Sequence, residues 1–283
     1  MGMGNLDWNQ IWKDQVRENR SVPGFKSGTD LWKKKKVAEE YRAPAERVKT
    51  TLALLPLGPT LSVLDIGAGP GTLAIPLAGQ VRSITAVEPA AGMASVIREK
   101  TDVGACRNLR VVQERWEDVV PACDLDGPYD LVLASFSLGM EDLAGALEKM
   151  DAVSSGSVHL FWFADVPGWE RHYLEIWPSL HAAQYRPVPK ADVVFNLLWQ
   201  RGKHPDLVQM PLVQEEWFRD LDEAFFHYAP KFGVADVRQE GVLRTALERW
   251  LVREGEMLVM RERSHAAHIW WEKEEDAVPW CEG

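Results

Sequence analysis

Short apolar runs recur along the first part of the chain, and stretches of helical character separate them. The apolar or β-branched runs occupy residues 61–66, 83–88, 109–113, 129–135 and 157–163. The stretches between them at 71–80, 90–101 and 141–151 are predicted to be helices. Strands that alternate with helices indicate a parallel sheet covered by helices on both faces, and nearly continuous apolar strands fit such burial.

The flanking regions show other patterns. Residues 5–55 mix apolar and charged positions as amphipathic helices do, which predicts an N-terminal helical cap over 1–55 in front of a core at 56–163. The segment 164–206 lacks strand alternation and is rich in aromatic residues and proline, so we expect a helical insert that covers a site. A strand at 207–213, a helix at 236–254 and a strand at 265–273 would complete the sheet within a C-terminal part at 207–283. The expected fold is therefore α/β, with a doubly wound, mostly parallel seven-stranded sheet and a helical lid.

A glycine-rich loop follows the first predicted strand, in the sequence LSVLDIGAGPGTLAIPLAGQ at 61–80. Glycines at this point let a ligand approach the backbone closely. Dinucleotide loops use the spacing G-x-G-x-x-G, whereas here the third glycine, Gly71, comes one residue early after Gly67 and Gly69. Asp65 would also repel a diphosphate and would suit a ligand that carries an ammonium group.

These residues resemble the first motif of class I S-adenosylmethionine (SAM)-dependent methyltransferases. Glu88 ends the second predicted strand 21 residues after Gly67, Met93 follows five residues later, and YDLVLASFSL at 129–138 is similar to the family's fourth-strand motif. The resemblance covers about residues 60–163. It implies a Rossmann-like fold, SAM as the cofactor, and transfer of its methyl group by direct displacement to an acceptor that the sequence does not identify.

The resemblance also implies roles for individual residues. Glu88 would accept both ribose hydroxyls, Met93 would pack under the adenine, and the end of the fourth strand would face the methyl group. The expected cofactor-binding set is Asp65, Gly67, Ala68, Gly69, Glu88, Pro89, Met93, Trp116, Glu117 and Ser135. Alternative roles remain open, because Asp65 could cap the amides of the loop and Glu88 could act as an acid at a helix N-terminus.

The third strand departs from the family pattern, which places an aspartate there to hold the adenine amino group. The sequence QERWEDV puts Arg115 and Trp116 at the aligned positions. Arginine cannot accept a hydrogen bond from an amine. Glu117, which we favour slightly, or Asp118 could accept it, or Trp116 could stack on the ring. Alternatively Trp116 only begins a helix and the adenine binds through the backbone.

No catalytic residue stands out, and alignment of the reactants can suffice for methyl transfer without a general base. A base would come from the insert over the carboxyl ends of the strands. The candidates there are His172, Tyr173, His181, Tyr185 and His204, each more readily explained as structural. The aromatic residues of 164–206 would line an acceptor pocket, or they would fill the core of a helical subdomain.

Composition limits the expected binding partners and the expected cellular compartment. A net charge of −10 disfavours nucleic acids and anionic membranes, and we expect a small-molecule acceptor. Cys106, Cys123 and Cys281 are widely spaced, which fits a reducing cytoplasm, and the seven histidines form no metal motif. We expect neither a signal peptide nor a membrane span. The 13 tryptophans fit an aromatic core or a pocket for a flat or cationic ligand.

Three other functions remain open. The chain could be a non-catalytic SAM-binding module, a methyltransferase acting on protein side chains, or, as the most distant alternative, an NAD-dependent reductase. The glycine spacing and Asp65 argue against the reductase.

Overall fold

The parallel half of the sheet follows the chain order that the apolar runs predicted. The computed structural model describes residues 6–23, 45–102, 104 and 106–273. Its parallel strands are β1 (Ser62–Ile66), β2 (Ser83–Val87), β3 (Leu109–Val112), β4 (Tyr129–Ser135) and β5 (Ser154–Phe163). The order across the sheet is β3-β2-β1-β4-β5-β8-β6, with β8 (Met257–Glu272) antiparallel to both β5 and β6 (Asp206–Phe218). The expected α/β fold with a mostly parallel sheet is confirmed.

The C-terminal strands differ most from expectation. A short strand, β7 (Val252–Glu254), pairs with β8, so the sheet has eight strands rather than seven. The strands β6 and β8 are also much longer than the predicted 207–213 and 265–273. The part of β6 beyond the predicted run begins with the polar residues Gln214, Glu215 and Glu216, which gave no apolar signal for a longer strand. Pairing between the two long strands, which are far apart in sequence, supplies their backbone hydrogen bonds instead.

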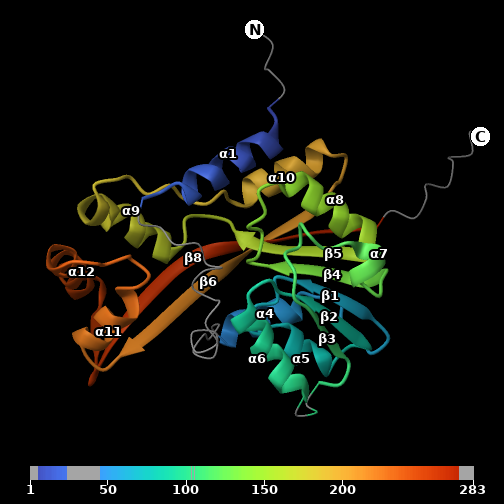
Figure 1. The fold of residues 1–283 in the computed structure, drawn as a ribbon, viewed down its shortest axis with the longest axis horizontal. Coiled ribbons are helices and arrows are strands. Elements are labelled where there is room, and N and C mark those ends of the chain that lie inside the picture. The colour runs from blue at the N-terminus through green and yellow to red at the C-terminus, as the bar shows by residue number, and fades with distance from the viewer. Residues whose placement is uncertain (1–5, 24–44, 103, 105, 274–283) are drawn as a thin grey trace, which may run out of the picture.

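Two groups of helices cover the sheet (Figure 1). One face packs against α1 (Trp8–Arg20), α8 (Leu143–Val153) and α10 (Ala191–Gln200). The other face packs against α4 (Ala45–Ala53), α5 (Ala74–Ala78) and α6 (Ala91–Asp102). Helix α5 is shorter than the predicted 71–80, because the glycine loop occupies the first part of that stretch. Of the predicted cap over 1–55, α1 and α4 are described, and 1–5 and 24–44 lie outside the described residues.

A separate helical lobe stands off the end of the sheet where β4 and β5 terminate. It contains α9 (Gly168–His181), α11 (Leu221–Tyr228) and α12 (Val237–Trp250), packed around the far ends of β6 and β8 (Figure 1). A four-residue helix, α7 (Pro121–Asp124), lies at the opposite end, before β4. The expected insert 164–206 is helical, but its two helices belong to different cores, because α10 packs beside α1 on the sheet.

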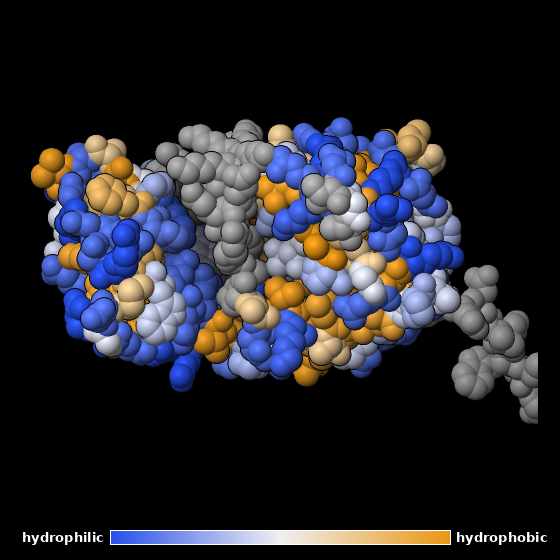
Figure 2. Space-filling view, turned by 90° about the horizontal axis from the view of Figure 1, so that it is seen from below, coloured by the Kyte–Doolittle hydropathy of each residue, from blue (hydrophilic) through white to orange (hydrophobic). Residues whose placement is uncertain are grey.

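The surface shows no single apolar face in the view from below. Figure 2 shows hydrophilic residues predominating over the helical lobe at the left, with apolar and hydrophilic residues interspersed over the sheet domain at the right. Single exposed apolar side chains of this kind are usual on proteins. Among the described residues, no helix combines the length and the apolar character needed to cross a bilayer.

Candidate functional site

The glycine loop lies at the carboxyl ends of β1 and β2, and its glycines serve different purposes. All three have positive φ, at 72° for Gly67, 59° for Gly69 and 82° for Gly71. A Cβ atom on Gly67 would lie 2.3 Å from Cβ of Ser137, and one on Gly71 would lie 2.5 Å from Cδ1 of Ile75. A Cβ on Gly69 would meet no atom of the described residues within 4 Å. Close packing therefore favours glycine at the outer two positions, whereas no described side chain packs against the backbone at Gly69.

Glu88 ties this loop to the end of β2. Its carboxylate accepts hydrogen bonds from the backbone N–H of Gly69 at 2.8 Å and of Ala90 at 2.7 Å. The side chain is nearly enclosed, with 6 % of the residue exposed, and this burial raises the pKa of Glu88 against the lowering effect of the two backbone hydrogen bonds. The capping role left open for Glu88 is thus present, and each carboxylate oxygen retains a further lone pair.

Asp65 is buried beneath the loop with an unused acceptor. The residue is 2 % exposed, and Oδ2 has no hydrogen-bond partner among the described atoms. Burial, followed by the nearby charge of Glu88, raises the pKa of Asp65 to about 7, while a backbone hydrogen bond from Ala74 lowers it. An ionised Asp65 is therefore costly in the free protein and would gain from a cation placed above the loop.

The raised pKa of Asp65 predicts a specific dependence of stability on pH. Between pH 3.8 and about 7 the folded protein holds this proton and the unfolded chain does not, so the contribution of Asp65 to the unfolding free energy falls as pH rises through that window. Asp65→Asn removes the titration. We expect the variant to gain on the order of 2–4 kcal/mol relative to the native protein between pH 5 and pH 8. Urea unfolding at both pH values measures this gain, and a constant difference between the two proteins would contradict it.

The turn after β4 lies against the glycine loop. The hydroxyl of Ser137 donates to the carbonyl of Ile66 at 2.6 Å, which joins the ends of β4 and β1. Phe136 adopts a left-handed backbone with φ of 55°, which is unfavourable for an aromatic residue and is held by a hydrogen bond from its N–H to the carbonyl of Phe161 at 2.9 Å. Both residues lie in the SFSL segment of the sequence, but nothing in the sequence indicated the left-handed conformation of Phe136. Ser135, a predicted contact, is partly exposed at the strand end.

The residues expected to hold an adenine are only partly placed as predicted. Met93 is buried at the start of α6 beside Ala90, as a packing role requires. Trp116 is not an open stacking surface, because its indole N–H donates to the carbonyl of Ala146 at 3.1 Å and the Lys149 ammonium lies 5.0 Å from its ring centre. The stacking hypothesis for Trp116 is wrong, since packing on α8 uses the ring.

Glu117 and Asp118 lie at the surface. Arg115 donates to Glu117 at 2.6 Å, and its Nε lies 3.8 Å from the carboxylate of Asp118. The choice between these two acids as the partner of an adenine amino group stays a prediction. Ala68 and Pro89 lie beside Gly67 and Glu88 in the chain, with Ala68 buried and Pro89 partly buried.

Three of the weak candidates for a base, His172, Tyr173 and Tyr185, belong to the helical lobe. Tyr185 is buried, and its hydroxyl accepts a hydrogen bond from Nδ2 of Asn19 at 3.2 Å. Burial raises the pKa of Tyr185 and of Tyr173 further above its usual range, which argues against either as a base, and the choice of a base stays a prediction. His172 stacks on Trp250, with its Nδ1 3.0 Å from the carboxylate of Glu262.

The remaining histidines of the insert have structural contacts. His181 lies 2.9 Å from the carbonyl of Phe232, and His204 packs edge-on against Trp199. No cluster of three or more His, Cys, Asp or Glu side chains with the geometry of a metal site occurs in the part of the chain that the structure describes.

The sequence also gave no sign of a histidine–aspartate pair at the carboxyl end of β5. Nδ1 of His265 lies 2.9 Å from one carboxylate oxygen of Asp165, and the other oxygen accepts a hydrogen bond from the His265 backbone at 2.9 Å. The two residues are a hundred positions apart, and only the pairing of β5 with β8 brings them together. This contact orients the ring and leaves Nε2 available at the same edge of the sheet as the glycine loop.

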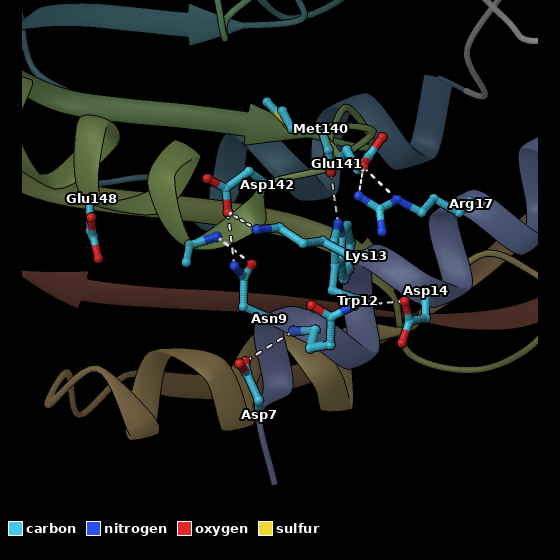
Figure 3. Close-up of polar contacts among 12 residues, drawn as sticks. Asp7, Asn9, Trp12, Lys13, Asp14, Arg17, Met140, Glu141, Asp142 and Glu148 are labelled. Carbon is cyan, nitrogen blue, oxygen red and sulfur yellow. Dashed lines mark hydrogen bonds and ion pairs between the residues drawn. The ribbon is translucent and has the colours of Figure 1, made fainter.

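Helix α1 holds the segment 137–142 that follows β4 (Figure 3). The indole of Trp12 donates to the carbonyl of Met140 at 2.7 Å. The amide of Asn9 donates to Asp142 at 2.8 Å and accepts from the N–H of Ala144 at 2.9 Å. The N-terminal helix thereby fixes the same segment that packs against Gly67.

Comparison with known proteins shows what the glycine-loop part of the chain is similar to. Residues 63–155 match the model of a family described as a methyltransferase domain. A protein of Haemophilus influenzae with no assigned function is 28 % identical over 175 residues, a match that spans 56 % of this chain and 59 % of that protein. The chain thus covers less than two thirds of that relative.

Two solved structures share the fold. The YcgJ protein of Bacillus subtilis superimposes with a TM-score of 0.57 at 14 % identity, covering 82 % of this chain and 100 % of its own. A protein of Bacillus halodurans C-125 described as a candidate methyltransferase gives a TM-score of 0.56 at 14 % identity with the same coverage. At this identity the likeness establishes the fold.

Proposed function

We propose that this chain, which carries a class I SAM-dependent methyltransferase domain with SAM as its cofactor, transfers the methyl group to a small acceptor bound between the glycine-loop edge and the helical lobe. Two observations carry the proposal, both made among the described residues: no atom packs against the backbone of Gly69, and one carboxylate oxygen of the buried Asp65 has no hydrogen-bond partner. An anionic ligand would oppose a charge on that oxygen, whereas a ligand bearing sulfonium and ammonium groups would stabilise it.

The residues of the site fit such a ligand. Glu88 has lone pairs free for ribose hydroxyls, Met93 offers an apolar contact, and the Gly69 backbone allows close approach. The cofactor, when bound, supplies an activated methyl group. The chain would then bind the cofactor and the acceptor, orient them and exclude water from the site. The β4 turn at Phe136 would position the acceptor. Where the acceptor must lose a proton, His265, oriented by Asp165, is better placed than any residue of the insert.

Calorimetry with SAM, its demethylated product and NADH tests the cofactor. We expect saturable binding of the first two and at least tenfold weaker binding of NADH, because a diphosphate would meet Asp65 and Glu88. The affinity for SAM should also rise with pH through about 7 as Asp65 ionises, and it should lose this dependence in Asp65→Asn. Tighter binding of NADH would overturn the proposal in favour of a reductase.

A run of aromatic contacts supports a small, partly apolar or cationic acceptor. Ring centres of Phe136 and Phe163 lie 5.0 Å apart, those of Phe163 and Trp169 6.0 Å, and those of Trp169 and Tyr173 5.6 Å. The run leads from the end of β4 into the lobe. Trp177 and Tyr185 lie fully buried beyond it, so that part of the insert matches the alternative of a subdomain with its own aromatic core.

Replacing Trp169 by alanine should therefore lower methylation of the acceptor more than SAM affinity. The measurement uses labelled SAM with a cell metabolite extract, followed by counting of labelled small molecules. We expect at least a fivefold loss of label with less than a twofold change in SAM affinity, because truncating an aromatic contact costs about 1 kcal/mol or more. Trp199→Ala on the exposed side of α10 is the matched control.

The same experiment separates the other functions. Label that appears in precipitated protein would indicate methylation of protein side chains. Binding of SAM without label in either fraction would indicate a non-catalytic module. A cytoplasmic location stays a prediction from the spacing of the cysteines.

A further inference from the structure

The parallel strands have a second edge, where they begin, and a pocket of about 300 Å³ lies there. The first residues of four strands line it, namely Ser62 of β1, Ser83 of β2, Leu109 of β3 and Tyr129 of β4. The glycine loop lies at the other end of the same strands, and a five-residue strand spans roughly 16 Å. The pocket is therefore separate from the proposed cofactor site.

This pocket is basic in a strongly acidic chain. Three arginines line it, Arg82, Arg107 and Arg110, with one acid, Asp126, in the lining and a second, Asp130, beside Arg82. The whole chain carries a net charge of −10, so such a local excess of positive charge is not a property of its general composition. Guanidinium groups present donors in a planar fork that matches the oxygens of phosphate.

Neighbouring groups hold two of the arginines in place. Arg110 donates to the carboxylate of Asp126 at 2.6 Å and to the carbonyl of Asp124 at 2.8 Å. Arg82 lies 3.8 Å from the carboxylate of Asp130, which accepts hydrogen bonds from the backbone and the hydroxyl of Ser62, both at 2.7 Å. Each guanidinium keeps further N–H groups for a ligand, since it has five.

Arg107 differs because no hydrogen bond or ion pair of its side chain is found within the part of the chain that the structure describes. Its backbone is nevertheless fixed by the next residue, since the side-chain amide of Asn108 donates to the carbonyls of Ala78 at 2.9 Å and of Val81 at 3.0 Å. This contact joins the turn before β3 to the turn before β2. The backbone that carries Arg107 is thus fixed, and its guanidinium is left to bind a ligand.

Two buried hydroxyl groups belong to the lining of the pocket, beside the apolar side chains of Ile84 and Leu109. Tyr129 and Thr85 are buried, and the tyrosine hydroxyl donates to the threonine hydroxyl at 2.9 Å. The hydroxyl of Ser83 lies at the rim, on a residue that is partly exposed. A small, highly charged ligand would therefore find donors on its sides.

We propose that this pocket binds a small anion with two or more adjacent phosphate groups. Three guanidinium groups offer more donors than one phosphate can use, and the volume suits a compact ligand better than a nucleic acid strand. The proposal is independent of methyl transfer, because none of the residues involved belongs to the cofactor site.

Calorimetric titration with inorganic pyrophosphate at constant ionic strength tests it. We expect saturable binding at one site, and Arg107→Ala should weaken it about tenfold, as the loss of one charge-assisted contact does. Arg107→Lys keeps the charge without the fork and should give an intermediate loss. Arg98→Ala is the matched control, because it removes the same charge from an exposed arginine bound to Gln113 elsewhere, and it should change the affinity less than twofold. SAM affinity should stay the same in every variant, which shows that they are folded.

Three results would overturn the proposal. Titration without saturation would mean that no site exists. Equal losses in Arg98→Ala and Arg107→Ala would reduce the effect to general charge attraction. Tighter binding of a 20-nucleotide single strand than of pyrophosphate, with the same sensitivity to Arg107→Ala, would identify a nucleic acid surface instead.

Discussion

Replacing Glu88 by alanine is expected to weaken SAM binding by about a hundredfold while the protein remains folded. The carboxylate carries two roles, because it holds the backbone of Gly69 and Ala90 and would accept the ribose hydroxyls. Hydrogen bonds to a charged group contribute about 1.5–3 kcal/mol each, and 1.4 kcal/mol corresponds to a factor of ten. Loss of two ribose contacts therefore accounts for the expected effect. Calorimetry with SAM and with its demethylated product measures it.

Two further variants distinguish a role of Glu88 in SAM binding from a role in holding the backbone of the glycine loop. Glu88→Gln retains one carbonyl oxygen and should lose about tenfold, because the amide nitrogen cannot accept a second hydrogen bond. Glu114→Ala removes an exposed acid near the third strand and should leave the affinity within twofold. An unchanged SAM affinity in Glu88→Ala together with a lower melting temperature would show that Glu88 serves only to hold the loop.

Local sequence was sufficient for the parallel core. The strand at 129–135 was predicted to the residue, and β1, β2 and β3 were predicted to within one residue at each end. Burial on both faces makes such strands apolar throughout, and the glycines mark the turn between β1 and α5. The motif residues Gly67, Gly69 and Glu88 consequently fall together at one edge of the sheet, as expected.

Features that depend on distant contacts could not be predicted in the same way. The long pairing of β6 with β8 extends β6 past its apolar run at 207–213 into polar residues such as Gln214 and Glu216. The His265–Asp165 contact depends on which strand lies beside β5, and Trp116 turns into the core because α8 offers it a carbonyl. Helix α11 was missed although Asp220 caps it, since its eight residues make only about two turns.

Replacing Trp12 by alanine is expected to lower the unfolding free energy by about 3–5 kcal/mol, the usual cost of truncating a large buried aromatic side chain. Trp12 is 0 % exposed, and its ring centre lies 6.0 Å from that of Trp162 on β5. Its indole also donates to the carbonyl of Met140 at 2.7 Å, which would lose its partner inside the protein. Urea unfolding measures the change. Trp199→Ala, at a residue 56 % exposed, should cost less than about 0.5 kcal/mol.

Trp12→Phe tests whether α1 supports the cofactor site through this hydrogen bond. Phenylalanine keeps most of the packing but cannot donate to Met140, so the segment 137–142 should loosen with a stability loss of only about 1–3 kcal/mol. Ser137 in that segment packs against Gly67, and its hydroxyl bonds to the end of β1. We therefore expect SAM affinity to fall several-fold in Trp12→Phe at a temperature where the variant is fully folded. A SAM affinity equal to that of the native protein would mean that α1 stabilises the fold without positioning the glycine loop, and that the loop is held by its contacts with Glu88 and Ser137 alone.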